Sequence, residues 1–520
     1  MNFNHFTLRM MVELTLLMSL LVVKLPTTGA QSDTHDFTAI DTFVESSMKS
    51  SNLPGLELGI VHGDQVVHLQ SFGIADVSGR PVTPQTPFMV ASLTKSFTAV
   101  AIMQLVEAGQ VELDAPVQRY LPWFRLVDAE ASARITLRHL LNHTSGISRL
   151  TGNSILPTDD ARVPGPEAYI RGLSSAKLSH PVGEVPEYSN ANYAILGLIV
   201  ESVTGISYEQ YLKENIFTPL AMNNTFLSEQ EARQHGMATG YQMRFDNPIP
   251  LDLPFPYAFE AAGGIISTAE DISHYLIPYL NQGKYGDKTL LSPADMAQLW
   301  EPPSYIPLDE HSNYALGWTT DVPYEVPGND HSGSSGSFHS HMAVSPETGW
   351  GVVILTNADH LLLMSQPIEL MTWKVMGLLA KQPVQDSLPF TRILFVATFL
   401  LVALQLLTLV RRVFRLRYWM RHVGSRPHGL RQVLFRIIIP VALNLLVAYI
   451  FLIGLPQFAG LSFTALLVYI PDWGLGFVLG GLLAGSWLVW GLAAIFVVCE
   501  FRTDHSATER ILESSSQHAG

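Results

Sequence analysis

Ser92-Leu93-Thr94-Lys95 is the stretch on which the interpretation of this chain depends, because it joins a turn-rich segment, residues 80–87, to an apolar, helix-like run, residues 97–107. Gly109 follows as the expected stop of that helix. Residues three apart lie on one face of a helix, so the Ser92 hydroxyl and the Lys95 amine are predicted to meet. A serine hydroxyl is a poor nucleophile until a base takes its proton. An amine is such a base once burial or nearby positive charge lowers its pKa.

The Ser-x-x-Lys pattern occurs three times, at Ser46–Lys49, Ser92–Lys95 and Ser174–Lys177. The simplest interpretation of any single copy is a serine and a lysine on a helix surface. Only the copy at Ser92 combines a preceding turn, a following apolar helix and suitable partners further along the chain. Ser92 is therefore the candidate nucleophile.

The N-terminal and central parts of the chain predict an exported domain. Residues 1–30 combine an early arginine, an apolar core and a small-residue exit, which is typical of a signal peptide. If it is not cleaved, the same segment is a short membrane anchor. Residues 31–380 are expected to form the extracytoplasmic domain, and residues 381–390 a linker.

The last quarter of the chain predicts a membrane region, residues 391–500. It contains three apolar runs of spanning length, at residues 393–410, 437–455 and 473–498. Eight arginines and no acidic residue lie between the first two runs, which places that loop in the cytoplasm. Residues 458–470 are too short to cross and are expected at the outer interface. These features predict a multi-pass plasma-membrane protein whose cytoplasmic tail is residues 501–520.

Charge also separates the two parts. Residues 31–390 carry a net charge of −21, whereas residues 391–520 carry +6. So acidic an outer domain argues against nucleic acid as a partner and against adhesion to an anionic bilayer. The only cysteine, Cys499, ends the last apolar run, so the outer domain has no disulfide and depends on its core. The expected partners are a small-molecule or peptide substrate and the lipid bilayer.

The periodicity of apolar residues predicts an α+β outer domain. Helices are expected at residues 36–48, 136–143, 191–204, 208–217 and 361–379. Strands are expected at residues 55–61, 65–70, 314–320, 338–344 and 350–356, the first two as a hairpin. Strands at both ends with helices between them suggest that the first and last strands share one sheet.

Two downstream motifs supply partners for the nucleophile. In Tyr188-Ser189-Asn190, the phenol becomes a candidate general base if the Lys95 cation favours phenolate, and the Asn190 amide can orient Lys95 or a substrate carbonyl. In His331-Ser332-Gly333-Ser334, the small Gly333 lets a substrate approach, and strand N–H groups can bind an oxyanion. Taken singly, the first motif is also consistent with a core tyrosine, and the second with a Gly/Ser loop.

Two groups of histidines allow a metal site as an alternative. His139 and His143 have the spacing of a metal-binding helix, but no glutamate follows His139, so the zinc-protease pattern fails. The second group is Asp330, His331, His339 and His341. Catalysis by an activated serine requires neither group, and no metal or other cofactor is expected.

The ordered set Ser92-x-x-Lys95, Tyr188-x-Asn190 and His331-x-Gly333 resembles the serine β-lactamase-like superfamily. Its members include class C β-lactamases, low-molecular-weight penicillin-binding proteins, D-aminopeptidases and related esterases. The supporting stretches are residues 140–147, 188–197 and 262–268. The similarity runs from about residue 37 to residue 379 and leaves out the membrane region.

The resemblance implies a β-lactamase/DD-peptidase-like fold, in which an antiparallel sheet of five strands is flanked by helices and joined to a helical subdomain. It implies that Ser92 attacks a carbonyl while Lys95 and Tyr188 shuttle the proton. The backbone N–H groups of Ser92 and Ser334 would hold the oxyanion, and water would hydrolyse the acyl-enzyme. No metal is required.

One position departs from the pattern of the penicillin-recognising members, which usually carry Lys-Thr-Gly at the third motif. His331 stands here in place of the lysine that favours a substrate carboxylate, and it is mostly neutral at pH 7 if unperturbed. Some esterases and aminopeptidases of the superfamily resemble this chain in having histidine there. The departure favours esterase or peptidase activity over efficient β-lactam hydrolysis.

Three functions remain open from the sequence. The first is a membrane-anchored serine hydrolase acting outside the cell on esters, D-amino-acid peptides or wall-related amides. The second is a non-catalytic receptor that uses the same pocket, although its inner loop and tail each offer only about two dozen residues. The third is a channel or transporter, although the apolar runs carry almost none of the charge that a polar pathway needs.

Overall fold

The computed structural model describes residues 36–154, 165–253, 255–301, 312–320, 322, 324–386, 389–422, 434–458 and 460–516. The predicted signal segment, residues 1–30, lies outside them. Residues 40–520 group into one unit by their contacts. All contacts discussed below lie within this unit.

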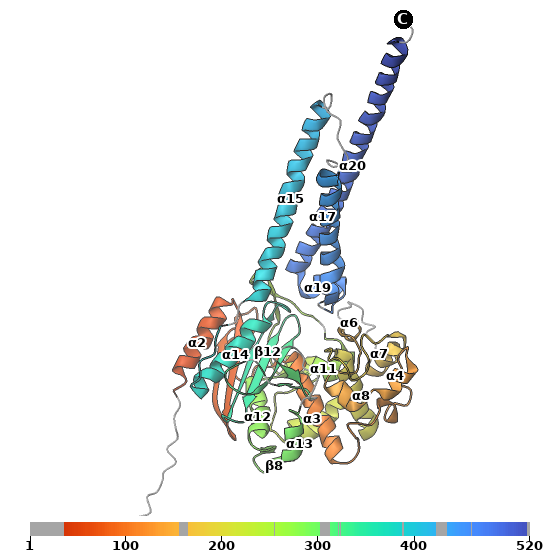
Figure 1. Cartoon of the computed structure of the whole chain (residues 1–520). Coiled ribbons are helices and arrows are strands. Elements are labelled where there is room, and N and C mark those ends of the chain that lie inside the picture. Colours follow the sequence, from red (N-terminus) through yellow and green to blue (C-terminus); the bar gives the residue numbers. More distant parts are fainter. Residues whose placement is uncertain are drawn as a thin grey trace, which may run out of the picture. The chain divides into compact units, whose positions relative to one another are not determined.

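A seven-stranded antiparallel sheet forms the centre of the domain that precedes the apolar runs, with strand order β2-β1-β13-β12-β11-β10-β9 (Figure 1). The strands are β1 (Gly55–His62), β2 (Gln65–Gly73), β9 (Asn313–Tyr314), β10 (Thr319–Thr320), β11 (Asn329–Ser334), β12 (His339–Ser345) and β13 (Trp350–Thr356). Gly59 of β1 is paired with Val353 of β13. The prediction that the first and last strands share one sheet is therefore confirmed.

Two predictions for the edge of this sheet were wrong. Residues 314–320 form a hairpin of two short strands rather than one strand, because Gly317 turns the chain with φ +78°. Residues 331–334, which lie ahead of the strand expected at residues 338–344 and also fit a Gly/Ser loop, are themselves part of the strand β11. Its polar, Gly- and Ser-rich sequence carries no apolar alternation, and its pairing along the whole of β12 fixes it instead. These short strands raise the implied five strands to seven.

Helices cover both faces of the sheet. Helix α12 (Ala269–Leu280) packs on β1 and β13, and α14 (Ser365–Ala380) packs on β12 and β13 (Figure 1). Thr268 caps α12 by accepting the backbone N–H of Asp271 at 3.1 Å. Helix α12 lies so close to β1 that a Cβ on Gly59 would lie 2.2 Å from Ser273 Oγ. Only a residue without a side chain fits at this position.

The helix that follows the nucleophile, α3 (Thr94–Glu107), is buried on all sides from Thr94 to Met103. A helix that is apolar around its whole circumference belongs in a core. It packs against α8 (Asn190–Thr204) and α11 (Glu260–Gly263). The remaining helices of this part are α4 (Ala129–Arg134), α5 (Leu137–Leu141), α6 (Arg149–Gly152), α7 (Pro166–Gly172), α9 (Tyr208–Leu212) and α10 (Glu229–Gln234). Together they form the expected helical subdomain.

Within the described residues, three helices are long and apolar enough to cross a membrane, at residues 390–415, 439–457 and 471–495. They belong to α15 (Phe390–His422), to α17 (Ile439–Tyr449) with its continuation into α18 (Leu455–Phe458), and to α20 (Pro471–Ser516). A short helix, α19 (Phe463–Tyr469), lies between the second and third. Large apolar side chains such as Leu407 and Val489 are more than half exposed on these helices. Such surfaces mark an interaction site.

Candidate active site

The candidate nucleophile lies in a strained turn. Ser92 is the middle residue of a single 3₁₀ turn, η1 (Ala91–Leu93), directly before α3. Ala91 has φ +48°, a conformation that costs a residue with a side chain about 1–3 kcal/mol. Neighbouring groups hold it there: Thr94 Oγ1 donates to Ala91 O at 2.7 Å and accepts the N–H of Ile265 at 3.1 Å. This turn leaves the Ser92 side chain partly exposed at a cavity wall.

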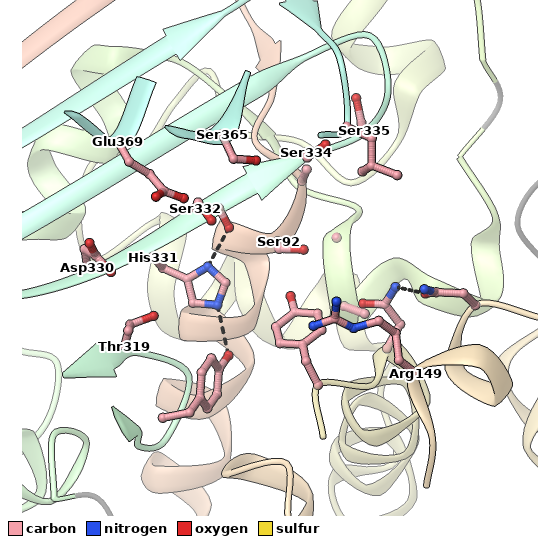
Figure 2. A pocket seen from close by; sticks show the side chains of 18 of the residues that line it. Ser92, Arg149, Thr319, Asp330, His331, Ser332, Ser334, Ser335, Ser365 and Glu369 are labelled. Atoms are coloured by element: carbon pink, nitrogen blue, oxygen red, sulfur yellow. Dashed lines mark hydrogen bonds between the residues drawn. The ribbon is translucent and has the colours of Figure 1, made fainter. Parts of the chain in front are cut away.

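The cavity beside Ser92 has a volume of about 550 Å³ and brings distant parts of the chain together. Five of the seven predicted site residues line it: Ser92, Tyr188, Asn190, His331 and Ser334. Figure 2 shows Ser92 between His331 of β11 and Arg149 of α6. The other two predicted residues, Lys95 and Gly333, lie directly behind this wall.

Lys95 is fully buried, and its contacts suit an uncharged amine. Its Nζ lies 2.9 Å from Asn190 Oδ1, 2.7 Å from Ala262 O and 3.1 Å from Ser92 Oγ. Burial places the pKa of Lys95 well below its ordinary value of 10.5. A neutral amine has two N–H donors and one lone pair. In this form the two carbonyl oxygens can take the donors, and the lone pair can accept the proton of the Ser92 hydroxyl.

Tyr188 differs from the phenolate that the sequence suggested. Burial raises its pKa above the ordinary value, and its hydrogen bond with Ser92 opposes this rise only partly. The Lys95 Nζ lies 4.7 Å from the centre of the ring, but a neutral amine provides no cation to stabilise a phenolate. The structure therefore favours a neutral phenol that can relay a proton at Ser92, and it favours Lys95 as the resting base.

His331 is neutral and held in one tautomer. Its Nδ1–H donates to Ser332 O at 2.7 Å, and its Nε2 accepts the hydroxyl proton of Tyr314 at 2.9 Å (Figure 2). Burial lowers the pKa of His331 to about 3. His331 thus offers no positive charge to a substrate carboxylate near neutral pH.

Gly333 and Ser334 bring the end of β11 against the nucleophile turn. A Cβ on Gly333 would lie 2.3 Å from Val90 O and 3.1 Å from Ser92 N, so only glycine permits this approach. Ser335 N donates to Phe338 O at 3.0 Å. Because hydrogen-bonded and non-hydrogen-bonded pairs alternate in an antiparallel ladder, the N–H of the neighbouring Ser334 points away from β12, toward the cavity. It is thus placed to donate to an oxyanion.

The structure adds residues that the sequence did not indicate. Tyr314 fixes the His331 tautomer, and Ala262 contributes only its backbone oxygen to Lys95. Asn153 Oδ1 accepts the Asn190 amide at 2.9 Å and so orients the group that contacts Lys95. Only Ala262 lies in a stretch that resembled the superfamily. Backbone acceptors and distant side-chain partners leave no local pattern in a sequence.

The other two Ser-x-x-Lys copies lie on the surface. Ser46 and Ser174 are exposed, as are the lysines that follow them, and Lys49 pairs with Glu45 at 2.6 Å. Burial and partners, rather than the pattern itself, distinguish Ser92.

The histidines of the two alternative metal groups take part in other contacts. His143 Nδ1 accepts the Ser189 N–H at 3.2 Å, and His139 Nδ1 accepts that of Thr136 at the same distance. His341 lies 3.3 Å from Asp330. Among the residues that the structure describes, no three His, Cys, Asp or Glu side chains gather closely enough to hold a metal ion.

The match to a known family agrees with this geometry. The model of the beta-lactamase family matches residues 40–365. This chain belongs to the beta-lactamase family. The match covers the sheet, the helical subdomain and every predicted site residue, and it ends before the first candidate span. As a member of a family related to the penicillin-binding proteins, the chain has the framework of a serine hydrolase.

Two individual proteins are similar to this chain over much of its length. Penicillin-binding protein 4 of Amycolatopsis lactamdurans is 31% identical over 316 residues, which are 59% of this chain and 81% of that protein. Protein flp of Staphylococcus aureus is 29% identical over 323 residues, which are 62% of this chain and 63% of that protein. The chain therefore matches less than two thirds of the length of the flp proteins.

Solved structures share the fold. The octameric penicillin-binding protein homologue from Pyrococcus abyssi has a TM-score of 0.58 and 28% identity, covering 69% of this chain and 80% of that one. A class C beta-lactamase has a TM-score of 0.56 at 20% identity, covering 66% of this chain and 95% of the other. These similarities agree with the fold class predicted from the sequence, a helix-flanked antiparallel sheet with a helical subdomain.

Proposed function

We propose that this member of the beta-lactamase family hydrolyses esters or amides through an acyl-enzyme on Ser92. Its domain, residues 31–380, lies outside the cell and is anchored in the plasma membrane by the three candidate spans. The arginine-rich connection between the first two spans supports this orientation. The substrate classes that fit are esters, D-amino-acid peptides and wall-related amides.

The observation that carries the proposal is the buried Lys95 amine, whose Nζ lies 3.1 Å from Ser92 Oγ and whose pKa is lowered by burial, so that its neutral form can take the Ser92 proton. In the acylation step, Oγ attacks the substrate carbonyl and its proton passes to Lys95. The oxyanion accepts hydrogen bonds from the N–H groups of Ser92 and Ser334. The proton then passes through the Tyr188 hydroxyl to the leaving group, and the bond from the carbonyl carbon to that group breaks.

Deacylation reverses these roles. A water molecule gives its proton to the same base and attacks the acyl carbon, and the released Ser92 oxygen recovers a proton. The neutral His331 beside the nucleophile favours substrates without a carboxylate at that position. Ester hydrolysis is thus favoured over β-lactam hydrolysis.

Pre-steady-state kinetics tests the proposal directly. The full-length protein in detergent should release about one equivalent of p-nitrophenol from p-nitrophenyl butyrate in a burst and then turn over steadily. Peptide mass spectrometry should place the butyryl group on Ser92. A burst with no later turnover would favour a receptor that is acylated once. An adduct on another residue, or no reaction, would contradict the mechanism.

A further inference from the structure

Part of the cavity wall comes from the membrane region. Leu461 and Tyr469, which flank or end the short helix α19, line the same cavity as Ser92. Both side chains are at most 7% exposed. They lie outside the residues that the family model matches, 40–365. This part of the wall therefore comes from beyond the matched domain.

Polar contacts fix the end of α19 and the start of α20 to the outer domain. Asp472, at the start of α20, accepts the Nε2–H of His360 at 3.1 Å and the backbone N–H of Phe245 at 3.0 Å. The side chains of His360 and Asp472 are 2% and 1% exposed. Gln242 Nε2 donates to Val468 O at 2.6 Å. These three hydrogen bonds, one of them within a fully buried pair, make a specific junction rather than a casual contact.

The chain just before α19 is linked to Lys95, the candidate base, by a series of side-chain hydrogen bonds. Lys95 Nζ contacts Asn190 Oδ1, Asn190 Nδ2 donates to Asn153 Oδ1, and Asn153 Nδ2 donates to Gly460 O at 3.1 Å. Gly460 has φ +66°, and a Cβ there would lie 2.3 Å from Arg149 Cγ. The connection between the second and third spans thus rests directly on α6, beside the nucleophile.

The wall formed by Leu461 and Tyr469 is apolar and continues away from the cavity. Both residues belong to one buried cluster with Phe451 and Trp473 of the second and third candidate spans, and Leu361 and Leu362 of the cavity pack against it. The opposite side of the cavity is polar, with Asp330, Ser332, Ser365 and Glu369 around His331 (Figure 2). One cavity therefore presents a polar side and an apolar side that leads to the spans.

We infer that the substrate is an amphiphile held in the bilayer, with its reactive carbonyl near its polar end. Its head enters the cavity at Ser92, and its hydrocarbon portion lies along Leu461 and Tyr469. A cavity of about 550 Å³ suits a head group, so a long chain must continue along the apolar wall. Each methylene removed from water there should favour binding roughly fourfold. This inference rests on the proposed hydrolase function and narrows its substrate class.

Chain-length selectivity in the full-length protein tests the inference. The probes are p-nitrophenyl butyrate in solution and two long-chain esters in phosphatidylcholine vesicles, p-nitrophenyl decanoate and decyl acetate. The decanoate carries its chain on the acyl side and the acetate on the leaving group. The wild type should prefer at least one long-chain ester over the butyrate by tenfold or more in kcat/KM. The preferred ester should react faster in vesicles than as dissolved monomer.

Substitutions in the wall should reduce that preference. Leu461→Ala and Tyr469→Ala should each lower the long-to-short ratio about tenfold. Leu467→Ala, a leucine of the same helix that is 37% exposed, should leave the ratio unchanged. Leu461→Met, which keeps volume and polarity, should also retain it. Fluorophosphonate labelling of Ser92 in each variant shows that its site is assembled.

Two kinds of failure are distinguishable. If butyrate is hydrolysed in a Ser92-dependent way but the ratio is near one, or is equal in all variants, the inference is overturned and the hydrolase stands. Equal rates in vesicles and in solution would also overturn it. If no probe is turned over through Ser92, the proposed function itself fails.

Discussion

Replacing Ser92 with alanine should lower kcat/KM for p-nitrophenyl butyrate by on the order of a million-fold, to the level left by binding and the oxyanion donors alone. The reason is that Ser92 Oγ faces both the Lys95 amine and the cavity, and it is the atom proposed to form the bond to the acyl group. Steady-state assays of the full-length protein measure the effect. The thermal unfolding temperature should change little, because Ser92 is only partly buried.

Ser174→Ala is the matched control. Ser174 starts another Ser-x-x-Lys copy in the same chain, but it is exposed. Its replacement should leave both activity and unfolding unchanged, since surface substitutions away from special features are close to neutral. Residual turnover within tenfold of wild type in Ser92→Ala would show that the nucleophile has been misassigned.

Lys95→Met should reduce kcat by about ten-thousand-fold, the upper range for losing a positioned general base. Methionine is unbranched like lysine and suits the buried site, but it cannot take the Ser92 proton. The loss should appear mainly in kcat, since the Lys95 side chain lies behind the cavity wall. Rapid-quench measurement of Ser92 acylation should show the same decrease as steady-state turnover.

Two comparisons separate loss of the base from loss of structure. Lys177→Met removes an exposed lysine from the matched motif and should have no effect on activity. The double variant Ser92→Ala/Lys95→Met should be no slower than Ser92→Ala alone, because residues that act as one unit are not additive. Additive losses would contradict a direct proton transfer between the two groups.

The sequence indicated the parts of the site that follow from local geometry. The spacing of Ser92 and Lys95 on one helical turn predicts their contact, and the two side chains lie 3.1 Å apart in the structure. The resemblance supplied the distant motifs at Tyr188 and His331. What it did not supply was the protonation state. Burial is a tertiary property, and it lowers the pKa of Lys95 while it raises that of Tyr188.

The fold was predictable wherever a short apolar run is bounded by turn residues or apolar residues follow a helical period, as in β1 and β13 for the strands. It was not predictable for β11, whose residues are mostly polar or small and whose strand conformation depends on pairing with β12. The cavity wall at Leu461 and Tyr469 was also missed. Residues 458–470 were expected only to lie at an interface, because nothing local links them to a nucleophile more than 350 residues earlier.

The most direct test of the central claim, a neutral Lys95 poised to activate Ser92, is the pH dependence of kcat/KM for an ester. This constant reports the groups of the free enzyme. Because burial lowers the pKa of Lys95, the base form should prevail above that lowered value. Activity should therefore rise through an apparent pKa well below 10.5 and be level through neutrality, and Lys95→Met should abolish this limb. A rise of activity whose apparent pKa stays near 10.5, or a rise that persists in Lys95→Met, would contradict the claim.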